Sequence, residues 1–169
     1  MPQRTPVKNL TRTICLTLAV LLGSLVTGCG ADFDKGFAAY KSGDFATALG
    51  ELRPLSEQGH ADAQFLLGAM YSGAQGVLQD YKTAVKWWTP AAEQGHVGAQ
   101  TSLGLMYQYG TGVPQDNVYA YMWWQIAAAS GYKDASKNRD NIAKEMTPAQ
   151  IEKAKKLARE CIAKEYKGC

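Results

Sequence analysis

Two consecutive segments of this chain read HADAQFLLGAMYSGAQGVLQDYKTAVKWWTPAAEQG (residues 60–95) and HVGAQTSLGLMYQYGTGVPQDNVYAYMWWQIAAASG (residues 96–131). The shift that places His60 on His96 also places both Leu-Gly pairs, both Met-Tyr pairs and both Trp-Trp pairs on one another. A tandem repeat of this length is typical of solenoids, in which each unit is one supersecondary element that buries its apolar face against its neighbours.

Each unit predicts two helices joined by a glycine-containing loop. In the first half, Ala63, Leu67 and Tyr71 fall on one helix face, and in the second half Ala84 and Trp88 do the same. The side chains expected to form the core between hairpins are Leu67, Tyr71, Trp87, Trp88, Leu103, Tyr107, Trp123 and Trp124.

Other repeated residues predict how the helices begin and pack. Asp80 and Asp116 are expected N-caps, because a carboxylate can accept from the free amides of the next turn. Gly68 and Gly104 lie inside the first helix of each unit, where glycine costs about 1 kcal/mol relative to alanine. A cost repeated at one position predicts close approach by a neighbouring helix.

This set of residues resembles the Sel-1-like repeat, a relative of the tetratricopeptide repeat. The second loop, Gly110-Thr111-Gly112-Val113, has the full Gly-x-Gly-Val pattern of that family, whereas Ala74 replaces the first glycine in the first loop. The resemblance implies an all-α fold: a short right-handed solenoid of antiparallel helix hairpins with a C-terminal capping helix.

The flanking segments differ from the repeats, as capping units do. Residues 33–59 predict a shorter N-terminal capping hairpin, and residues 132–169 predict C-terminal capping helices with a disulfide tail. Within the latter, residues 132–146 predict one more helix, and Thr147-Pro148-Ala149-Gln150 is a capping box that begins a lysine-rich helix to about Glu165. Pro54 and Pro90 predict kinks late in two second helices, with carbonyl-based binding as the alternative.

The N-terminus predicts export and lipidation. Residues 1–28 combine three basic residues with an apolar stretch too short for a membrane span, and they precede Cys29 in the sequence Val-Thr-Gly-Cys. That tetrapeptide resembles the bacterial lipobox, which implies a signal peptide (residues 1–28), diacylation at Cys29 and an acylated linker (residues 29–32). Gly30 after the cysteine implies an outer-membrane address and a periplasm-facing protein. An ordinary secretory leader is the alternative.

Removal of this leader lowers the Lys and Arg total from 18 to 15, equal to the 15 Asp and Glu. The mature chain is therefore neutral and loses the basic excess that nucleic-acid binding needs. Its charge is uneven: residues 29–131 carry five basic and nine acidic residues, and residues 132–169 carry ten and six.

Two cysteines remain after Cys15 leaves and Cys29 is acylated. Cys161 and Cys169 in an oxidising compartment predict one disulfide, with a metal or reactive-thiol role as the alternative. On a continuous helix they would lie about 12 Å apart, too far to bond. We therefore expect the chain to turn back after Tyr166, with the help of Gly168.

The sequence offers little for catalysis. It lacks nucleophile-elbow, Walker, dinucleotide-binding and zinc-protease motifs. The only histidines, His60 and His96, begin equivalent helices, where capping or packing is the expected role. We predict no enzyme activity, no cofactor and no metal site.

Three tyrosines depart from the repeat: Tyr109, Tyr119 and Tyr121 replace Gly73, Thr83 and Val85. Because tyrosine is enriched at interfaces, they are the candidate partner-binding residues. The resemblance implies a binding scaffold, since relatives are mostly interaction scaffolds and some bacterial envelope members act as immunity proteins or assembly factors. The expected partner is a protein or peptide of the cell envelope. The alternative is a binder of cell-wall glycan through exposed aromatic residues, or of penicillin-type ligands, including their hydrolysis, by analogy with cysteine-rich relatives.

Overall fold

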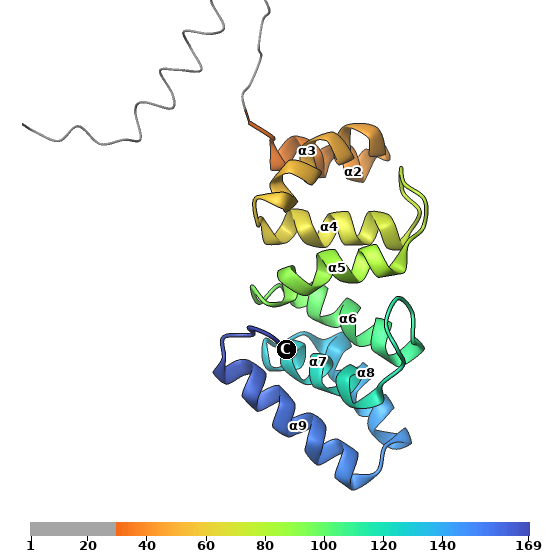
Figure 1. Cartoon of the computed structure of the whole chain (residues 1–169), viewed down its shortest axis with the longest axis vertical. Helices are drawn as coiled ribbons and strands as arrows, with labels where there is room; N and C mark the ends of the chain where they lie inside the picture. The colour runs from red at the N-terminus through yellow and green to blue at the C-terminus, as the bar shows by residue number, and fades with distance from the viewer. Residues whose placement is uncertain (1–29) are drawn as a thin grey trace, which may run out of the picture. The chain divides into compact units, whose positions relative to one another are not determined.

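Both halves of each repeat fold as helices in the computed structural model, which describes residues 30–169 (Figure 1). The predicted signal peptide and Cys29 lie outside the described residues. The described helices are α2 (Phe33–Ser42), α3 (Phe45–Glu57), α4 (Ala61–Ser72), α5 (Tyr81–Ala92), α6 (Val97–Tyr109), α7 (Asn117–Ala129), α8 (Lys133–Ile142), the 3-10 turn η1 (Ala143–Glu145) and α9 (Pro148–Ala163).

Successive helices pair as hairpins, α2 with α3, α4 with α5 and α6 with α7, and the hairpins of the unit Asp32–Cys169 stack in sequence order. The helix α7 also packs against both α8 and α9. The predicted solenoid of helix hairpins, all-α over the described residues, is confirmed. No described helix is long and apolar enough to cross a bilayer.

Helix starts follow the predicted capping chemistry. The Asp80 and Asp116 side chains accept hydrogen bonds from the backbone amides of Thr83 and Tyr119, respectively. The Thr147 capping box is present at the start of α9. These bonds satisfy amides that have no partner within the helix.

The two repeated helix glycines, Gly68 and Gly104, pack directly against the indole rings of Trp88 and Trp124. A Cβ atom built on Gly68 would lie 2.5 Å from Nε1 of Trp88, and one built on Gly104 would collide with Trp124 in the same way. Each indole nitrogen then donates to a carbonyl of the facing helix, from Trp88 to Phe65 at 3.1 Å and from Trp124 to Thr101 at 3.2 Å. The predicted close approach is therefore confirmed, and the glycine is what lets the indole reach the backbone.

Two buried glutamines join successive hairpins. Gln64 donates to the carbonyl of Ser56 at the end of α3, and Gln100 donates to the carbonyl of Ala92 at the end of α5. The Gln64 carbonyl oxygen also accepts from Gln94, whereas Ser130 stands at the equivalent position for Gln100. Consistent with this difference, Oε1 of Gln100 is buried without a hydrogen-bond partner among the described residues.

The C-terminal segment differs in detail from the prediction. The helix expected over residues 132–146 ends at Ile142 and continues as η1, and α9 ends at Ala163 rather than near Glu165. The chain reverses earlier than expected, because Glu165 and Tyr166 already have positive φ values of 53° and 66°. Cys161 and Cys169 are bonded to each other, with their Cα atoms 5.5 Å apart.

Candidate interaction surfaces

The structure divides the predicted core residues into two groups. Leu67, Leu103, Trp88, Trp123 and Trp124 are at most 4% exposed and lie in the core. Tyr71, Tyr107 and Trp87 are only half-buried. Tyr71 and Tyr107 nevertheless pack against the largest core cluster, so they border the core rather than lie inside it.

The three candidate binding tyrosines do not form one surface. Tyr109 is 69% exposed at the end of α6. Tyr119 is half-buried and stacks on Tyr107, with ring centroids 5.1 Å apart. Tyr121 is 6% exposed and packs in the cluster that includes Ile142, so it offers no surface to a partner. The face of α7 that carries it is turned toward the C-terminal cap.

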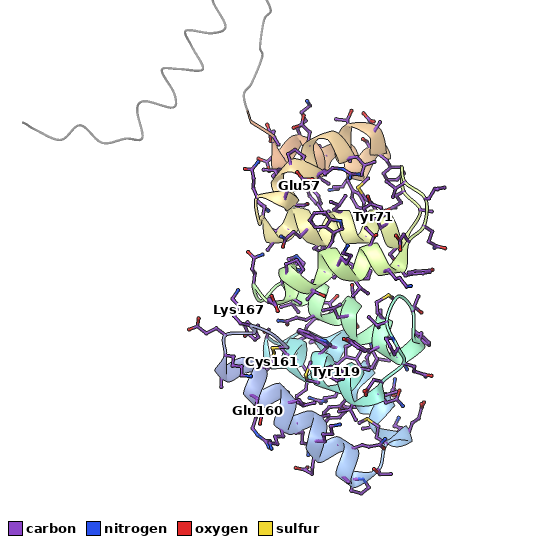
Figure 2. All side chains as sticks on the ribbon, in the orientation of Figure 1. Glu57, Tyr71, Tyr119, Glu160, Cys161 and Lys167 are labelled. Carbon is purple, nitrogen blue, oxygen red and sulfur yellow. A yellow bond between two sulfur atoms is a disulfide. The ribbon has the colours of Figure 1, made fainter. Side chains whose placement is uncertain are left out.

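An open hollow of about 410 Å³ lies between α3, α4 and α5. Its lining residues are Arg53, Tyr71, Thr83, Lys86 and Trp87. Arg53 Nη2 lies 3.3 Å from the hydroxyl oxygen of Tyr71, to which it donates. Among residues 30–169, neither Arg53 nor Lys86 forms an ion pair with a carboxylate. The hollow thus combines two exposed cations with two half-buried aromatic side chains (Figure 2 labels Tyr71).

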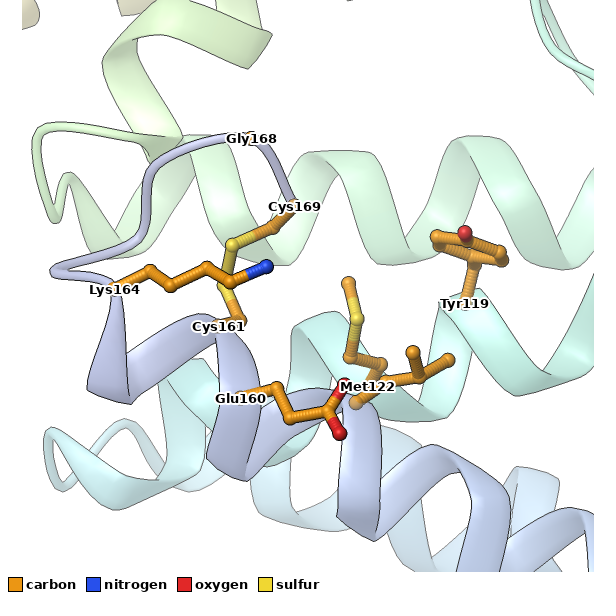
Figure 3. A pocket seen from close by; sticks show the side chains of 8 residues that line it. Tyr119, Met122, Glu160, Cys161, Lys164, Gly168 and Cys169 are labelled. Carbon is orange, nitrogen blue, oxygen red and sulfur yellow. A yellow bond between two sulfur atoms is a disulfide. The ribbon is translucent and has the colours of Figure 1, made fainter.

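A second, smaller hollow of about 100 Å³ lies between α7, α9 and the C-terminal tail (Figure 3). Tyr119 and Met122 come from α7, while Leu157, Glu160 and Cys161 come from α9. Lys164, Gly168 and Cys169 complete its lining. The tail is fixed on the preceding repeat as well, since Lys167 and Gly168 both donate hydrogen bonds to Glu93.

The two hollows share two repeat positions, those of Thr83 and Lys86, on the second helix of each repeat. The repeat register aligns Thr83 with Tyr119, Lys86 with Met122 and Trp87 with Trp123. In the second repeat α9 packs on this surface of α7 and Trp123 is 2% exposed. In the first repeat Trp87 stays half-buried beside Arg53 and Lys86.

A third hollow, of about 300 Å³, is bordered by aromatic residues of α2 and α4. Its lining includes Phe33, Phe37, Asp62, Phe65 and His96. Phe65 stacks on the His96 ring with centroids 4.4 Å apart, and Phe33 stacks on His60 in the same way at 4.7 Å. Each stack joins one hairpin to the next.

The two histidines serve the helix starts, as predicted. Nδ1 of His60 accepts from the amide of Ala63, and Nδ1 of His96 accepts from the amide of Ala99. Nε2 of His96 also lies 3.3 Å from the Asp62 carboxylate. Burial lowers the pKa of His96 below its ordinary value, and the carboxylate of Asp62 only partly offsets this. Within the described part of the chain no group of three metal-ligating side chains exists.

Sequence reasoning missed Arg53 and Lys86 as functional candidates. The available signal was their scarcity: residues 29–131 carry only five basic residues, and Lys86 stands where the next repeat has Met122. The informative departure from the repeat at this position is therefore a charged residue rather than an aromatic one.

Comparison with known proteins supports the same class of protein, a helical-repeat scaffold. Residues 61–96 and 97–132 each match the Sel1 repeat. The chain therefore carries two Sel1 repeats, and its fold supports placing it among the Sel1-like repeat (SLR) proteins. Repeats of this kind form protein–protein interaction modules, which are generally not enzymes.

Two solved structures are similar to this chain. One is a protective antigen of uropathogenic Escherichia coli strains that displays an SLR fold, with 29% identity and a TM-score of 0.73 over 78% of this chain and 30% of the other. The second is a Sel1 repeat protein from Oxalobacter formigenes, with 28% identity and a TM-score of 0.65 over 76% of this chain and 55% of the other. This chain thus spans about a third and about half of their lengths. No protein with a curated description matches it.

Proposed function

We propose that this chain is a lipid-anchored, periplasm-facing interaction module of a bacterial envelope, which binds a protein or peptide through its helical-repeat surface. The observation that supports binding is the open hollow of Arg53, Tyr71, Thr83, Lys86 and Trp87 on a fold whose relatives are binding scaffolds. Stacked hairpins present an extended surface, which suits one segment of a partner better than a small molecule.

The proposal for the anchor rests on the leader and on Cys29. Acylation adds about 0.8 kcal/mol of membrane affinity for each buried methylene, so a multiply acylated cysteine is a stable anchor. Labelling cells with a fatty-acid analogue tests it directly. We expect the full chain to incorporate the label and fractionate with the outer membrane, and Cys29→Ser to do neither. Equal labelling of both proteins contradicts the anchor.

Affinity capture with chemical crosslinking tests the binding function. The full chain is the bait in an envelope extract, and a Tyr109→Ala/Tyr119→Ala variant is compared with it. We expect one discrete protein to be crosslinked to the wild type. Loss of that protein in the variant assigns the surface to the tyrosines, and unchanged recovery assigns it elsewhere on the solenoid. The absence of any crosslinked protein contradicts the proposed function.

Glycan binding is the second candidate, supported by the half-buried rings of Tyr71 and Trp87, which both line the open hollow. Cosedimentation with purified sacculi separates the two candidates, since a glycan binder pellets with the wall and a protein-binding module stays in the supernatant. Hydrolysis of penicillin-type ligands has less support. Both histidines use Nδ1 to accept backbone amides, which leaves neither of these nitrogens free as a general base.

A further inference from the structure

The surface of the first repeat that stays open is the one that α9 covers in the second repeat. Met122 and Tyr119 of α7 border a hollow whose other walls come from α9 (Leu157, Glu160 and Cys161) and from the tail that follows it (Lys164, Gly168 and Cys169). Their equivalents, Lys86 and Thr83 of α5, border a hollow to which no described segment of the C-terminal cap contributes. In the second repeat, a helix with the short tail that follows it therefore lies against this surface.

The charges of the two surfaces differ in a way that selects the occupant. The helix α9 is rich in basic residues, including Lys153, Lys156 and Arg159, and it lies on a surface with Met122. The open surface carries Arg53 and Lys86, which have no carboxylate partner among residues 30–169. A basic helix such as the α9 of a second copy is repelled there, whereas an acidic helix gains two charge-assisted contacts.

The aromatic part of the hollow supplies the apolar contact. Trp123 is buried in a cluster that includes Ala158 and Cys161 of α9, while its equivalent Trp87 stays half-buried. Trp and Arg are the residue types that most often dominate binding energy when a partner desolvates them. Arg53 is already oriented by its hydrogen bond to Tyr71, which lowers the entropy lost on binding.

We propose that the hollow of Arg53, Thr83, Lys86 and Trp87 binds an acidic amphipathic helix of a partner protein, which lies on α5 as α9 lies on α7. The inference rests on the proposed function and specifies its site and partner class. Apolar residues of the partner helix contact Trp87, and its carboxylates pair with Arg53 and Lys86.

A defined peptide tests the proposal without knowledge of the natural partner. The probe has the sequence of residues 147–164 with Cys161→Ser and with Lys153, Lys156 and Lys164 changed to Glu; the control peptide keeps the three lysines. Binding to the purified full chain is measured by fluorescence anisotropy at low salt. We expect the acidic peptide to bind at least tenfold more tightly than the basic one, and to weaken as salt rises. Equal affinity for the two peptides overturns the proposal.

Matched protein variants locate the site. Arg53→Glu/Lys86→Glu should weaken binding of the acidic peptide at least tenfold. Lys41→Glu/Lys82→Glu changes the net charge equally at positions outside the hollow and should weaken it less than threefold. The exchange Arg53→Lys/Lys86→Arg, which keeps both charges, should retain binding. Equal loss in the first two variants shows nonspecific attraction and sinks the proposal.

The tryptophan indole N–H signals in NMR spectra give a readout that does not depend on charge. We expect the acidic peptide to shift the Trp87 signal and to leave Trp88, Trp123 and Trp124 unchanged, since those three are at most 4% exposed. An unmoved Trp87 signal at saturation contradicts the site. If crosslinking captures a natural partner whose recovery is unaffected by Arg53→Glu/Lys86→Glu, this inference fails while the proposed function stands.

Discussion

The backbone amide of Gly168 donates a hydrogen bond of 2.9 Å to the Glu93 carboxylate, 75 residues earlier in the chain. The bond joins the C-terminal tail to the turn between α5 and α6, so the last residues of the chain hold the second repeat against the first. The bond between Cys161 and Cys169 sets the position of this tail.

Loss of that disulfide should therefore destabilise the whole stack. Cys161→Ser opens a short loop and frees the tail from Glu93, and we expect the free energy of unfolding to fall by about 2–3 kcal/mol on the chain-entropy model. Urea unfolding of the wild type and the variant, each with and without reductant, measures it. Reductant should lower the stability of the wild type alone. Equal urea unfolding midpoints for wild type and Cys161→Ser, both without reductant, contradict a structural disulfide.

The first loop carries strain that the second loop avoids. Ala74 has a φ of 55°, and Gly110 at the equivalent position has a φ of 64°. A left-handed conformation costs a residue with a Cβ atom about 1–2 kcal/mol, whereas glycine adopts it freely. Ala74 therefore keeps the same left-handed turn as Gly110, but it makes the first loop less stable.

Ala74→Gly should consequently stabilise the protein by about 0.5–1 kcal/mol, because the greater flexibility of glycine in the unfolded chain offsets part of the gain. The reciprocal change, Gly110→Ala, should destabilise it by at least as much. Thermal unfolding of the pair provides the measurement. A lower melting temperature for Ala74→Gly than for the wild type would refute the strain at this position.

Glycines inside helices should respond to substitution in opposite ways. A Cβ atom on Gly68 collides with the Trp88 indole, whereas one on Gly50 of α3 meets nothing within 4 Å. Gly68→Ala must displace Trp88 and its bond to Phe65, and overpacking of this kind costs about 1–3 kcal/mol. Gly50→Ala, the matched control, should stabilise α3 by about 0.5–1 kcal/mol. Stability changes of the same sign in these two variants contradict the packing described for the tryptophans.

Stability should also fall with acidification through His96. Its folded pKa is lowered, mainly by burial, so between that pKa and the ordinary value near 6.5 the unfolded chain binds the extra proton. The contribution of His96 is therefore fully present above pH 6.5 and decreases as the pH falls toward the folded pKa. Protonation of Nδ1 also removes the cap on Ala99.

His96→Asn isolates this effect, because asparagine caps a helix but does not titrate. Unfolding free energies of both proteins are measured by urea titration from pH 7.5 to 5. As the pH falls, the stability of the wild type should decrease more than that of His96→Asn. Parallel pH profiles would show that His96 does not contribute.

The hairpins, their order and their contacts could be predicted from the sequence because the same packing residues occur at the same positions in both repeats. A glycine at position 68 is favourable only if Trp88 packs against it from the facing helix. Gly104 and Trp124 form the same pair in the second repeat. The capping roles of Asp80, Asp116 and both histidines were predictable for the same reason: each lies just before an apolar helix and has the acceptor that the first turn needs.

The surface was less predictable, because exposure depends on what lies above a repeat rather than within it. Tyr121 and Tyr119 are two residues apart, yet Tyr121 is buried in a cluster with Ile142, whereas Tyr119 borders the open hollow between α7 and α9. Trp87 and Trp123 occupy the same repeat position, yet Trp87 is half-buried, whereas Trp123 is 2% exposed in a cluster that includes Ala158 and Cys161 of α9. The spacing of residues within one repeat does not predict where the capping helix α9 packs.

Photo-crosslinking in living cells tests the central claim, a protein-binding repeat surface, most directly. A benzophenone amino acid replaces Thr83 in the hollow of the full chain, and Lys156, whose side chain is 70% exposed on α9, is the control position. We predict one discrete crosslinked protein from position 83, none from position 156, and loss of the product in the Arg53→Glu/Lys86→Glu background. Label transfer only to the cell-wall fraction, or the same products from both positions, would contradict the account.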